Sequence, residues 1–342
     1  MKKVDALSDS AACSTLTLAG QAVQLRALDT SAADDRAALL QLHREVFESA
    51  ADPDWFDWKY RAGGAIGFGL WHEDQLIAHC GGIPRSFSLA DGDAMLLQIG
   101  DVMVAPRWRG IFKRENPFTL VSGAMYEGML GRGRPYRIGF GFPNARHMRL
   151  AVKTGLAHHV GDITELSWQS AASTVTLGNF WRLEIVDAPT VAMVEGAWSA
   201  MCQDPVSQGL ALGVRDWNHV RWRYLDNPRR HYRFAAVRRP WRRQLTGLLV
   251  FTENDGLSWL DWIGSPGRIL LAAQAARVTS LTLGFDSVRA WCSPMITAAL
   301  AESSPISRQA VAAIGVPVRS DHGPVEPSQF PWWLMGGDTD FL

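Results

Sequence analysis

The segment VMVAPRWRGIFKREN, residues 102–116, joins an apolar run to a compact cluster of positive charge. A proline ends the run, and the next residues include Arg107, Arg109, Gly110, Lys113 and Arg114. Where a strand passes through a turn into a helix, unpaired backbone amides and the helix dipole favour a bound anion, most often a phosphate. Arginine can pair with phosphate in a bidentate way, and glycine allows close backbone approach. The segment therefore predicts a local phosphate site, with a solvated basic loop as the alternative.

The rest of the chain shows no charge bias that would explain this cluster. Its 34 Lys and Arg residues balance 34 Asp and Glu residues, and 47% of its residues are hydrophobic. We therefore expect a soluble globular protein that binds neither nucleic acid nor membrane. Its 4 cysteines are widely spaced, unlike a zinc site or a CxxC motif, and the histidines are scattered. This pattern predicts buried thiols, no metal, no secretory signal and a cytoplasmic location.

An internal repeat organises the chain. DWFDWKY at Asp54–Tyr60 resembles DWNHVRWRY at Asp216–Tyr224, and each is preceded by a stretch with helical apolar spacing. The following strands and helices also match in order. The helices that this pattern predicts are Asp34–Phe47, Pro117–Leu130, Thr190–Cys202 and Ile269–Leu281. A repeat of this length indicates two similar domains. We expect a flexible N-terminus at residues 1–20, a first domain at 21–168 and a second at 169–342.

The order of elements and motifs resembles the GCN5-related N-acetyltransferase (GNAT) superfamily. VAPRWRGIF matches the family pattern V-x-P-x-x-R-G-x-G-I through Gly110, and KTGL at Lys153–Leu156 matches the closing motif at its lysine and glycine. The resemblance covers about Val23 to Leu156 well, and the second half resembles the same fold. It implies an α/β (α+β) protein of two tandem GNAT-like domains, each a mixed, mostly antiparallel twisted sheet flanked by helices.

The resemblance also implies acetyl-CoA as co-substrate. It places the pantetheine arm along the family's fourth strand and the diphosphate in the basic turn, with Asn144 contacting the arm from the end of the splayed fifth strand. The cofactor-binding residues carried over in this way are Val102, Met103, Val104, Arg109, Gly110, Ile111, Phe112, Lys113 and Asn144. A backbone amide near Met103 or Val104 would stabilise the negative charge on the thioester oxygen.

The sequence departs from the family in three places. The second glycine of the turn is missing, so Phe112 or a shorter loop stands there. The tyrosine that often protonates the departing thiolate falls at Ala151. In the second half the corresponding strand leads into SPGR, and we expect no CoA site there.

Acetyl transfer also needs a base that takes a proton from the amine. Asp101, among the apolar residues of the fourth strand, is one candidate, because burial could raise its pKa. The alternative is a structural carboxylate at a strand bulge. His147, which follows the FPN motif, is the second candidate because histidine titrates near neutral pH. Its alternative is a surface or capping role.

Together these features predict an acetyl-CoA-dependent N-acetyltransferase that acts on a primary amine of a small molecule such as an amino sugar or amino acid. The alternative is a catalytically inactive GNAT-fold binding or scaffold protein. The arginine-rich stretch Asn227–Arg243 is interpreted as a solvated sheet edge, with docking of an anionic small substrate or of nucleic acid as the alternatives. The acceptor and the acyl chain length stay open, and we expect a monomer or homodimer.

Overall fold

The computed structural model describes residues 13–47, 52–110, 115–170, 177, 180–239, 245–318 and 331–339. The chain divides into two compact units, each built from separate segments of sequence. Unit 1 comprises Met1–Arg85, Met95–His159 and Gly315–Ser328. Unit 2 comprises Ser86–Ala94, Val160–Ile314 and Gln329–Leu342. Strands β4, β5, β7 and β14, whose bounds follow below, contribute residues to both units.

The sheet of unit 1 runs in the order β1-β2-β3-β4-β5-β6. Its strands are β1 (Ser14–Leu18), β2 (Gln21–Ala27), β3 (Ile66–His72), β4 (Gln75–Leu89), β5 (Gly92–Val104) and β6 (Gly139–Gly141). The pairs β1–β2, β2–β3 and β3–β4 are antiparallel, whereas β5 and β6 are parallel. Gly315 of β14 (Ser307–Pro317) pairs antiparallel with Gly141, so a segment near the end of the chain completes this unit.

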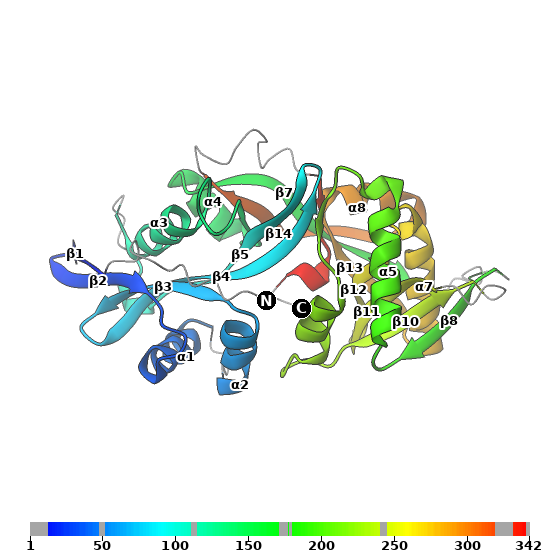
Figure 1. The fold of residues 1–342 in the computed structure, drawn as a ribbon, viewed down its shortest axis with the longest axis horizontal. Helices are drawn as coiled ribbons and strands as arrows, with labels where there is room; N and C mark the ends of the chain where they lie inside the picture. The colour runs from blue at the N-terminus through cyan, green and yellow to red at the C-terminus, as the bar shows by residue number, and fades with distance from the viewer. Residues whose placement is uncertain are drawn as a thin grey trace. The chain divides into compact units, whose positions relative to one another are not determined.

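Helices cover both faces of this sheet. They are α1 (Ala33–Phe47), α2 (Pro53–Phe56), the π-helical turn η1 (Asp57–Ala62), the 3-10 turn η2 (Pro106–Trp108), α3 (Pro117–Met129) and α4 (Ala145–Lys153). Figure 1 shows α1 and α2 on one side of β3 and β4, with α3 and α4 on the other. Proline at the first helical position and a side-chain cap from the preceding residue start both α2 and α3.

The strand β1 lies inside the segment that the sequence predicts to be flexible. It forms because Ala19 and Gly20 both take positive φ values, 49° and 84°, which suit a tight hairpin turn. The turn brings β1 back along β2 in continuous register from Leu18↔Gln21 to Ser14↔Leu25. Residues 1–12, the rest of that segment, lie outside the described residues.

Unit 2 repeats the plan. Its strands are β7 (Ala157–Gln169), β8 (Arg182–Val186), β9 (Ala211–Gly213), β10 (Arg233–Arg238), β11 (Leu245–Asn254), β12 (Gly256–Gly264), β13 (Ser287–Cys292) and β15 (Trp332–Trp333). Its helices and turns are α5 (Val191–Gln203), η3 (Pro205–Ser207), α6 (Trp217–Val220), η4 (Arg221–Leu225), η5 (Pro266–Arg268), α7 (Ile269–Thr282), α8 (Pro294–Ala299), η6 (Leu300–Ser303) and η8 (Gly336–Asp338). The predicted repeat is confirmed, because β10–β11–β12, α7, β13 and α8 follow one another as β3–β4–β5, α3, β6 and α4 do in unit 1.

Two apolar layers sandwich the sheet of unit 2. Alternate residues of a strand point to opposite faces, and Phe234 and Ala236 pack on one face with Val194 of α5. Ala235 and Val237 pack on the other face with Ala272 of α7. Both faces are therefore buried, which explains why β11 and β12 consist of nearly continuous apolar runs.

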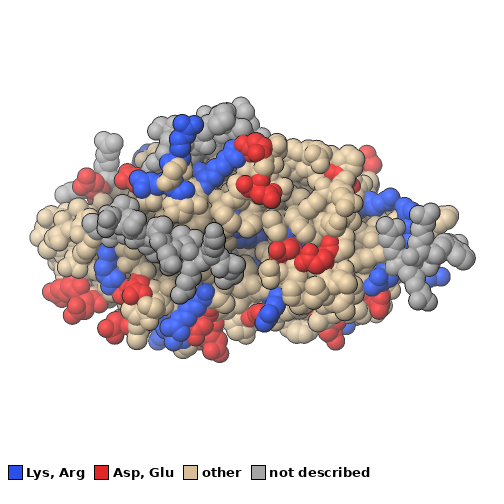
Figure 2. Space-filling view, viewed as in Figure 1, with Lys and Arg blue, Asp and Glu red and all other residues tan. Residues whose placement is uncertain are grey.

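The arginine-rich strand β10 is not a sheet edge, contrary to the expectation from sequence. It pairs antiparallel with β8 on one side and with β11 on the other. The charges of its arginines are compensated by acidic side chains. Arg233 pairs with Asp187 at 2.9 Å and with Glu253 at 2.6 Å, and Arg238 pairs with Glu184 at 3.3 Å. On the face shown in Figure 2, cationic and anionic side chains are interspersed.

The cysteines follow the expected pattern only in part. Cys80 and Cys292 are buried free thiols, but Cys13 and Cys202 are exposed. The reason for the difference is position: Cys80 lies in the interior strand β4, between β3 and β5, whereas Cys202 lies near the end of α5. In the described part of the chain, no helix is both long enough and apolar enough to cross a membrane.

The exchange of segments between the units leads to a first prediction. A fragment of residues 1–168 lacks Gly315–Pro317, which lie against Gly139, Gly141 and Met148 of unit 1. Because Val316 is fully buried, its loss exposes apolar surface. We expect the fragment to lose the cooperative thermal transition of the full chain when followed by circular dichroism, and co-expression with residues 169–342 to restore it. A fragment that melts cooperatively at the full-length temperature would contradict this.

Candidate active site

The central feature of unit 1 is a kink in β5 at Asp101. This residue has a φ of 47°, in the left-handed region that non-glycine residues rarely adopt. A conformation of this kind costs free energy and persists only where its surroundings hold it. The kink falls just before Val102–Val104, the stretch predicted to bind the pantetheine arm.

Three side chains hold Asp101 in place. Lys59 Nζ lies 3.0 Å from Asp101 Oδ1, and the Tyr60 hydroxyl donates to Oδ2 at 2.7 Å. On the main chain, His79 Nδ1 lies 2.8 Å from the Asp101 carbonyl oxygen. The ion pair is largely buried, with side-chain exposures of 5% for Lys59 and 10% for Asp101. Lys59 and Tyr60 come from η1, which therefore ties the N-terminal helices to the central strand.

The expected rise in the pKa of Asp101 is wrong. Burial does favour the neutral acid, but the positive charge of Lys59 and the hydrogen bond from Tyr60 outweigh burial, so the pKa lies below its ordinary value. An acid of low pKa is ionised but is a weak base. The geometry thus favours a positioning role for Asp101, the structural alternative noted from sequence.

His79 is fully buried and lies beside this network. Burial lowers its pKa to about 4, although Asp101 opposes the shift. Its ring is therefore neutral at pH 7, and Nδ1 can donate to the Asp101 carbonyl. This arrangement supports a structural role in fixing the kink.

Beyond the kink, β5 separates from its parallel neighbour. The register of β5 with β6 runs from Leu97↔Gly139 to Ile99↔Gly141, whereas β5 continues to Val104. The Ala105 amide donates to the Ile77 carbonyl of β4 at 2.8 Å. Because successive residues of a strand present their polar groups to opposite sides, those of Val104 face away from β4, toward the side where β6 has ended. The polar groups of Met103 face β4.

The predicted anion-binding turn begins directly after this strand. Pro106 starts η2, and the Arg109 amide closes it by donating to the Pro106 carbonyl at 3.2 Å. The Arg109 side chain returns to the strand, where Nε donates to the Val104 carbonyl at 2.9 Å. Gly110 has a φ of 84°, in the left-handed region that glycine adopts more readily than other residues. The other predicted turn residues, Ile111, Phe112 and Lys113, lie outside the described residues, as does Arg114.

The helix after the turn begins where the sequence predicts. Asn116 caps α3, because its side chain accepts from the Thr119 amide at 3.1 Å and Thr119 Oγ1 accepts from the Asn116 amide at 3.0 Å. This reciprocal cap satisfies amides at the first turn of the helix. The Thr119 amide is therefore already bonded within the helix cap.

Asn144 and His147 lie together at the start of α4. The Asn144 side chain accepts from the His147 amide at 2.9 Å and thereby caps the helix. The imidazole of His147 is exposed, yet its pKa lies below the ordinary value, first because of partial desolvation and then because of the charges of Arg146 and Arg109. It is therefore largely neutral at pH 7 and able to accept a proton. Ala151 lies on the buried face of the same helix and cannot supply one.

The predicted site residues thus fall into two groups. The charge of Arg109 contributes to the lowered pKa of His147, which links the turn electrostatically to the start of α4. Asp101 instead belongs to the buried network with Lys59, Tyr60 and His79. The sequence-based prediction missed Lys59 and Tyr60, although the repeated Trp–basic–Tyr motif that contains them was visible.

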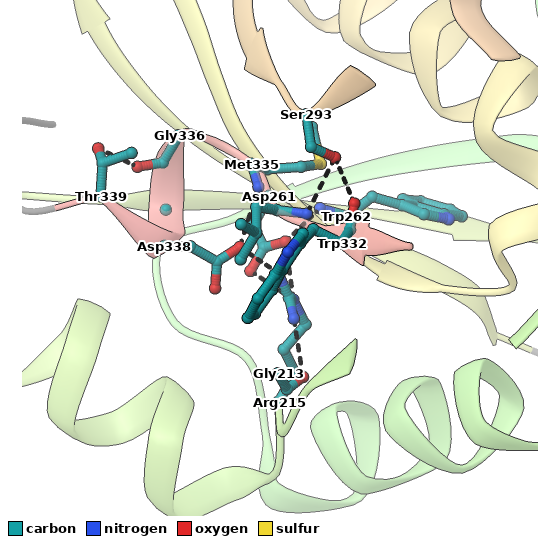
Figure 3. Close-up of polar contacts among 12 residues, drawn as sticks. Gly213, Arg215, Asp261, Trp262, Ser293, Trp332, Met335, Gly336, Asp338 and Thr339 are labelled. Carbon is teal, nitrogen blue, oxygen red and sulfur yellow. Dashed lines mark hydrogen bonds and ion pairs between the residues drawn. The ribbon is translucent and has the colours of Figure 1, made fainter. Parts of the chain in front are cut away.

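Unit 2 contains a counterpart of this network, shown in part in Figure 3. The Tyr224 hydroxyl of η4 donates to Asp261 Oδ2 on β12 at 3.0 Å, as Tyr60 does to Asp101. Here the cation is Arg215, whose Nε lies 2.9 Å from both carboxylate oxygens of Asp261 and whose Nη2 lies 2.7 Å from Asp338. All three charged groups are buried. Asp338 comes from the C-terminal turn η8, so the end of the chain is part of this core.

The turn of unit 2 that corresponds to the basic turn holds an internal carboxylate. Asp204 Oδ2 accepts from the Gly267 amide at 3.3 Å and from the Ser265 hydroxyl. Its other oxygen accepts from the Val206 amide at 2.7 Å. An anion supplied by the chain thus lies against the turn that precedes α7, and this favours the prediction that unit 2 binds no diphosphate.

Comparison with known proteins gives the same fold. Residues 27–144 match the model of an acetyltransferase (GNAT) domain family. A probable N-acyltransferase from Enterococcus faecalis V583 is 10% identical with a TM-score of 0.64, and 86% of this chain covers 71% of that one. A GCN5-related N-acetyltransferase from Kribbella flavida is 14% identical with a TM-score of 0.61, at 86% and 71% coverage.

A tandem GNAT protein from the clavulanic acid biosynthesis pathway is also similar. It is 12% identical with a TM-score of 0.55, and 89% of this chain covers 100% of it. The comparison with curated proteins gave no match. At these identities the solved structures establish the fold. Residues 27–144 thus match a GNAT domain family, and the chain as a whole shares its fold with GNAT proteins, including a tandem one.

The buried ion pair yields a stability prediction. Lys59→Met leaves the Asp101 carboxylate buried without its cation, and losing one partner of such a pair costs about 3–5 kcal/mol. The double variant Lys59→Met/Asp101→Asn removes both charges, so we expect it to be less destabilised than the sum of the single variants. Urea denaturation measures the free energy of unfolding of the single and double variants. If the losses of the two single variants added up strictly in the double variant, the two groups would not interact.

The electrostatic effect of Arg109 on His147 yields a further prediction. Arg109→Gln removes a positive charge that disfavours the imidazolium, so the pKa of His147 should rise toward its ordinary value. A proton NMR titration of the imidazole C2 proton reports this pKa. Arg107→Gln is the matched control, because Arg107 contacts Gln75 and should leave the pKa of His147 unchanged. If the pKa of His147 did not change in Arg109→Gln, the two residues would not interact electrostatically, and the prediction would be wrong.

Proposed function

We propose that this protein is an acetyl-CoA-dependent N-acetyltransferase that acetylates a primary amine of a small molecule, with the co-substrate held by unit 1. The observation that carries the proposal is the end of β5, where Val104 faces away from β4 beyond the end of β6 and leads into a turn with Arg109 and Gly110. A GNAT domain model covers the same residues. Cys13 and Cys202 are exposed free thiols, and Cys80 and Cys292 are buried ones. Free thiols fit a reducing compartment such as the cytoplasm.

The residues present suit such a co-substrate. On this proposal the backbone of Val104 pairs with the pantetheine arm, Arg109 and the turn hold the diphosphate, and Asn144 contacts the arm from the opposite side. When bound, acetyl-CoA supplies an activated acyl group as a thioester. Of the two backbone amides predicted to stabilise the thioester oxygen, the register favours Val104, because the polar groups of Met103 face β4.

His147 is the proposed base. Its lowered pKa keeps the imidazole neutral near pH 7, so it can take the proton that the attacking amine loses as the new carbon–nitrogen bond forms. The carbon–sulfur bond then breaks, and the protonated His147 can return that proton to the thiolate. This route needs no acid at Ala151. Asp101 contributes by holding the kink that sets the direction of Val102–Val104.

A binding or scaffold role without turnover is the second candidate. Ala151 in place of a proton donor favours it. The two candidates differ in one measurable product, since only the enzyme releases free thiol from acetyl-CoA when an amine acceptor is present. A thiol-release screen with amine libraries that include amino sugars and amino acids therefore separates them.

The binding proposal is tested by isothermal titration with CoA. We expect one CoA per chain, and Arg109→Glu should weaken binding by about tenfold or more, because it replaces a charge-assisted contact with repulsion. The internal repeat provides the matched control: Arg268→Glu alters the corresponding turn of unit 2, which already holds Asp204, and should leave the affinity unchanged. No heat with the wild-type protein would reject the proposal.

A further inference from the structure

The side chain of Arg109 is bonded to its own strand. Its Nε donates to the Val104 carbonyl at 2.9 Å, five residues back in the chain. The backbone of Arg109 is fixed separately, because its amide donates to the Pro106 carbonyl at 3.2 Å. The guanidinium can therefore leave Val104 by rotation of the side chain alone, without any change in the turn. Arg109 is exposed, so water can replace the lost bond at little cost.

The Val104 carbonyl that Arg109 covers lies on the side of β5 that faces away from β4. Ala105 presents its polar groups to β4, where its amide donates to Ile77, so Val104 presents its own groups to the opposite side. The paired part of β6 ends at Gly141, opposite Ile99. The Val104 carbonyl is therefore a strand acceptor beyond the last ladder pair with β6, and its described partner is the side chain of Arg109.

This contact competes with the function proposed above, on which the present inference rests. An amide of a pantetheine arm that pairs with the end of β5 needs the acceptor that Arg109 occupies. A diphosphate in the turn needs the guanidinium that Val104 occupies. Both requirements are met at once if the guanidinium moves from the carbonyl to the diphosphate, since a charged oxygen is the stronger acceptor.

We propose that Arg109 is a specificity-determining residue that makes binding of the pantetheine arm conditional on a diphosphate. In the free protein it covers the Val104 carbonyl, and a diphosphate draws it away and uncovers that acceptor. Ligands with a pantetheine arm but no diphosphate meet a covered acceptor. Acyl-CoA, which carries a diphosphate, is therefore the expected acyl donor, and a simple pantetheine thioester, which carries none, is expected to be a poor donor.

The test uses two ligands whose responses should have opposite signs. Binding of CoA and of pantetheine is measured by NMR titration for the full-length wild type, Arg109→Ala and Arg109→Met. Both variants uncover the carbonyl and remove the diphosphate contact. We expect CoA to bind about tenfold or more weaker and pantetheine to bind about two- to fivefold tighter. Arg107→Ala is the control, because it removes a cation of the same turn without touching Val104 and should not strengthen pantetheine binding.

The outcomes separate the two proposals. If wild type binds CoA but pantetheine affinity falls, stays the same or is undetectable in both Arg109 variants, the conditional mechanism is overturned and the CoA site remains. A fall for both ligands would mean that Arg109 contacts the arm and the diphosphate together. If wild type binds no CoA, the proposed function and this inference both fail. Thermal melts of the variants confirm that the exposed substitutions leave the fold intact.

Discussion

The structure of each unit depends on a carboxylate buried in its central strand. An ionised carboxylate is costly to bury unless a cation and hydrogen-bond donors surround it. Asp101 has Lys59 and Tyr60, and Asp261 has Arg215 and Tyr224. In both units the tyrosine comes from a π-helical turn that follows a short α-helix, so the same bond ties these helical turns to the strand that leads into the next turn and helix. The direction of that strand is therefore fixed by helices far from it in sequence.

The repeat also serves as an internal control on mechanism. Unit 2 keeps the tyrosine–aspartate bond although its turn is occupied by Asp204. A group that persists where no diphosphate is expected is better explained by folding than by catalysis. This comparison supports a positioning role for Asp101 and leaves His147, which is exposed at the start of α4, as the better proton acceptor.

Much of the architecture could be predicted from sequence, and the reasons are local. Apolar spacing placed α1, α3, α5 and α7 to within a residue or two, and the aromatic motif exposed the duplication. The ion pair between Lys59 and Asp101 joins residues 42 positions apart, and nothing in the spacing of charges indicated it. The lowered pKa of Asp101 was missed for the same reason, since burial was visible in the sequence but its compensating cation was not. Likewise, β10 was interpreted as an edge because its second neighbour, β8, lies far earlier in the chain and pairs Val186 with Phe234.

The interleaving of segments has a consequence for how such a chain can evolve. A duplicated domain that has lost its ligand is ordinarily free to be deleted. Here Gly315–Pro317, encoded after the whole of the second repeat, supply the strand that pairs with Gly141 in the first. A truncation that discards the second repeat also discards part of the sheet of the first. Selection on the first unit alone is then sufficient to retain the second, even if the second never binds a small molecule.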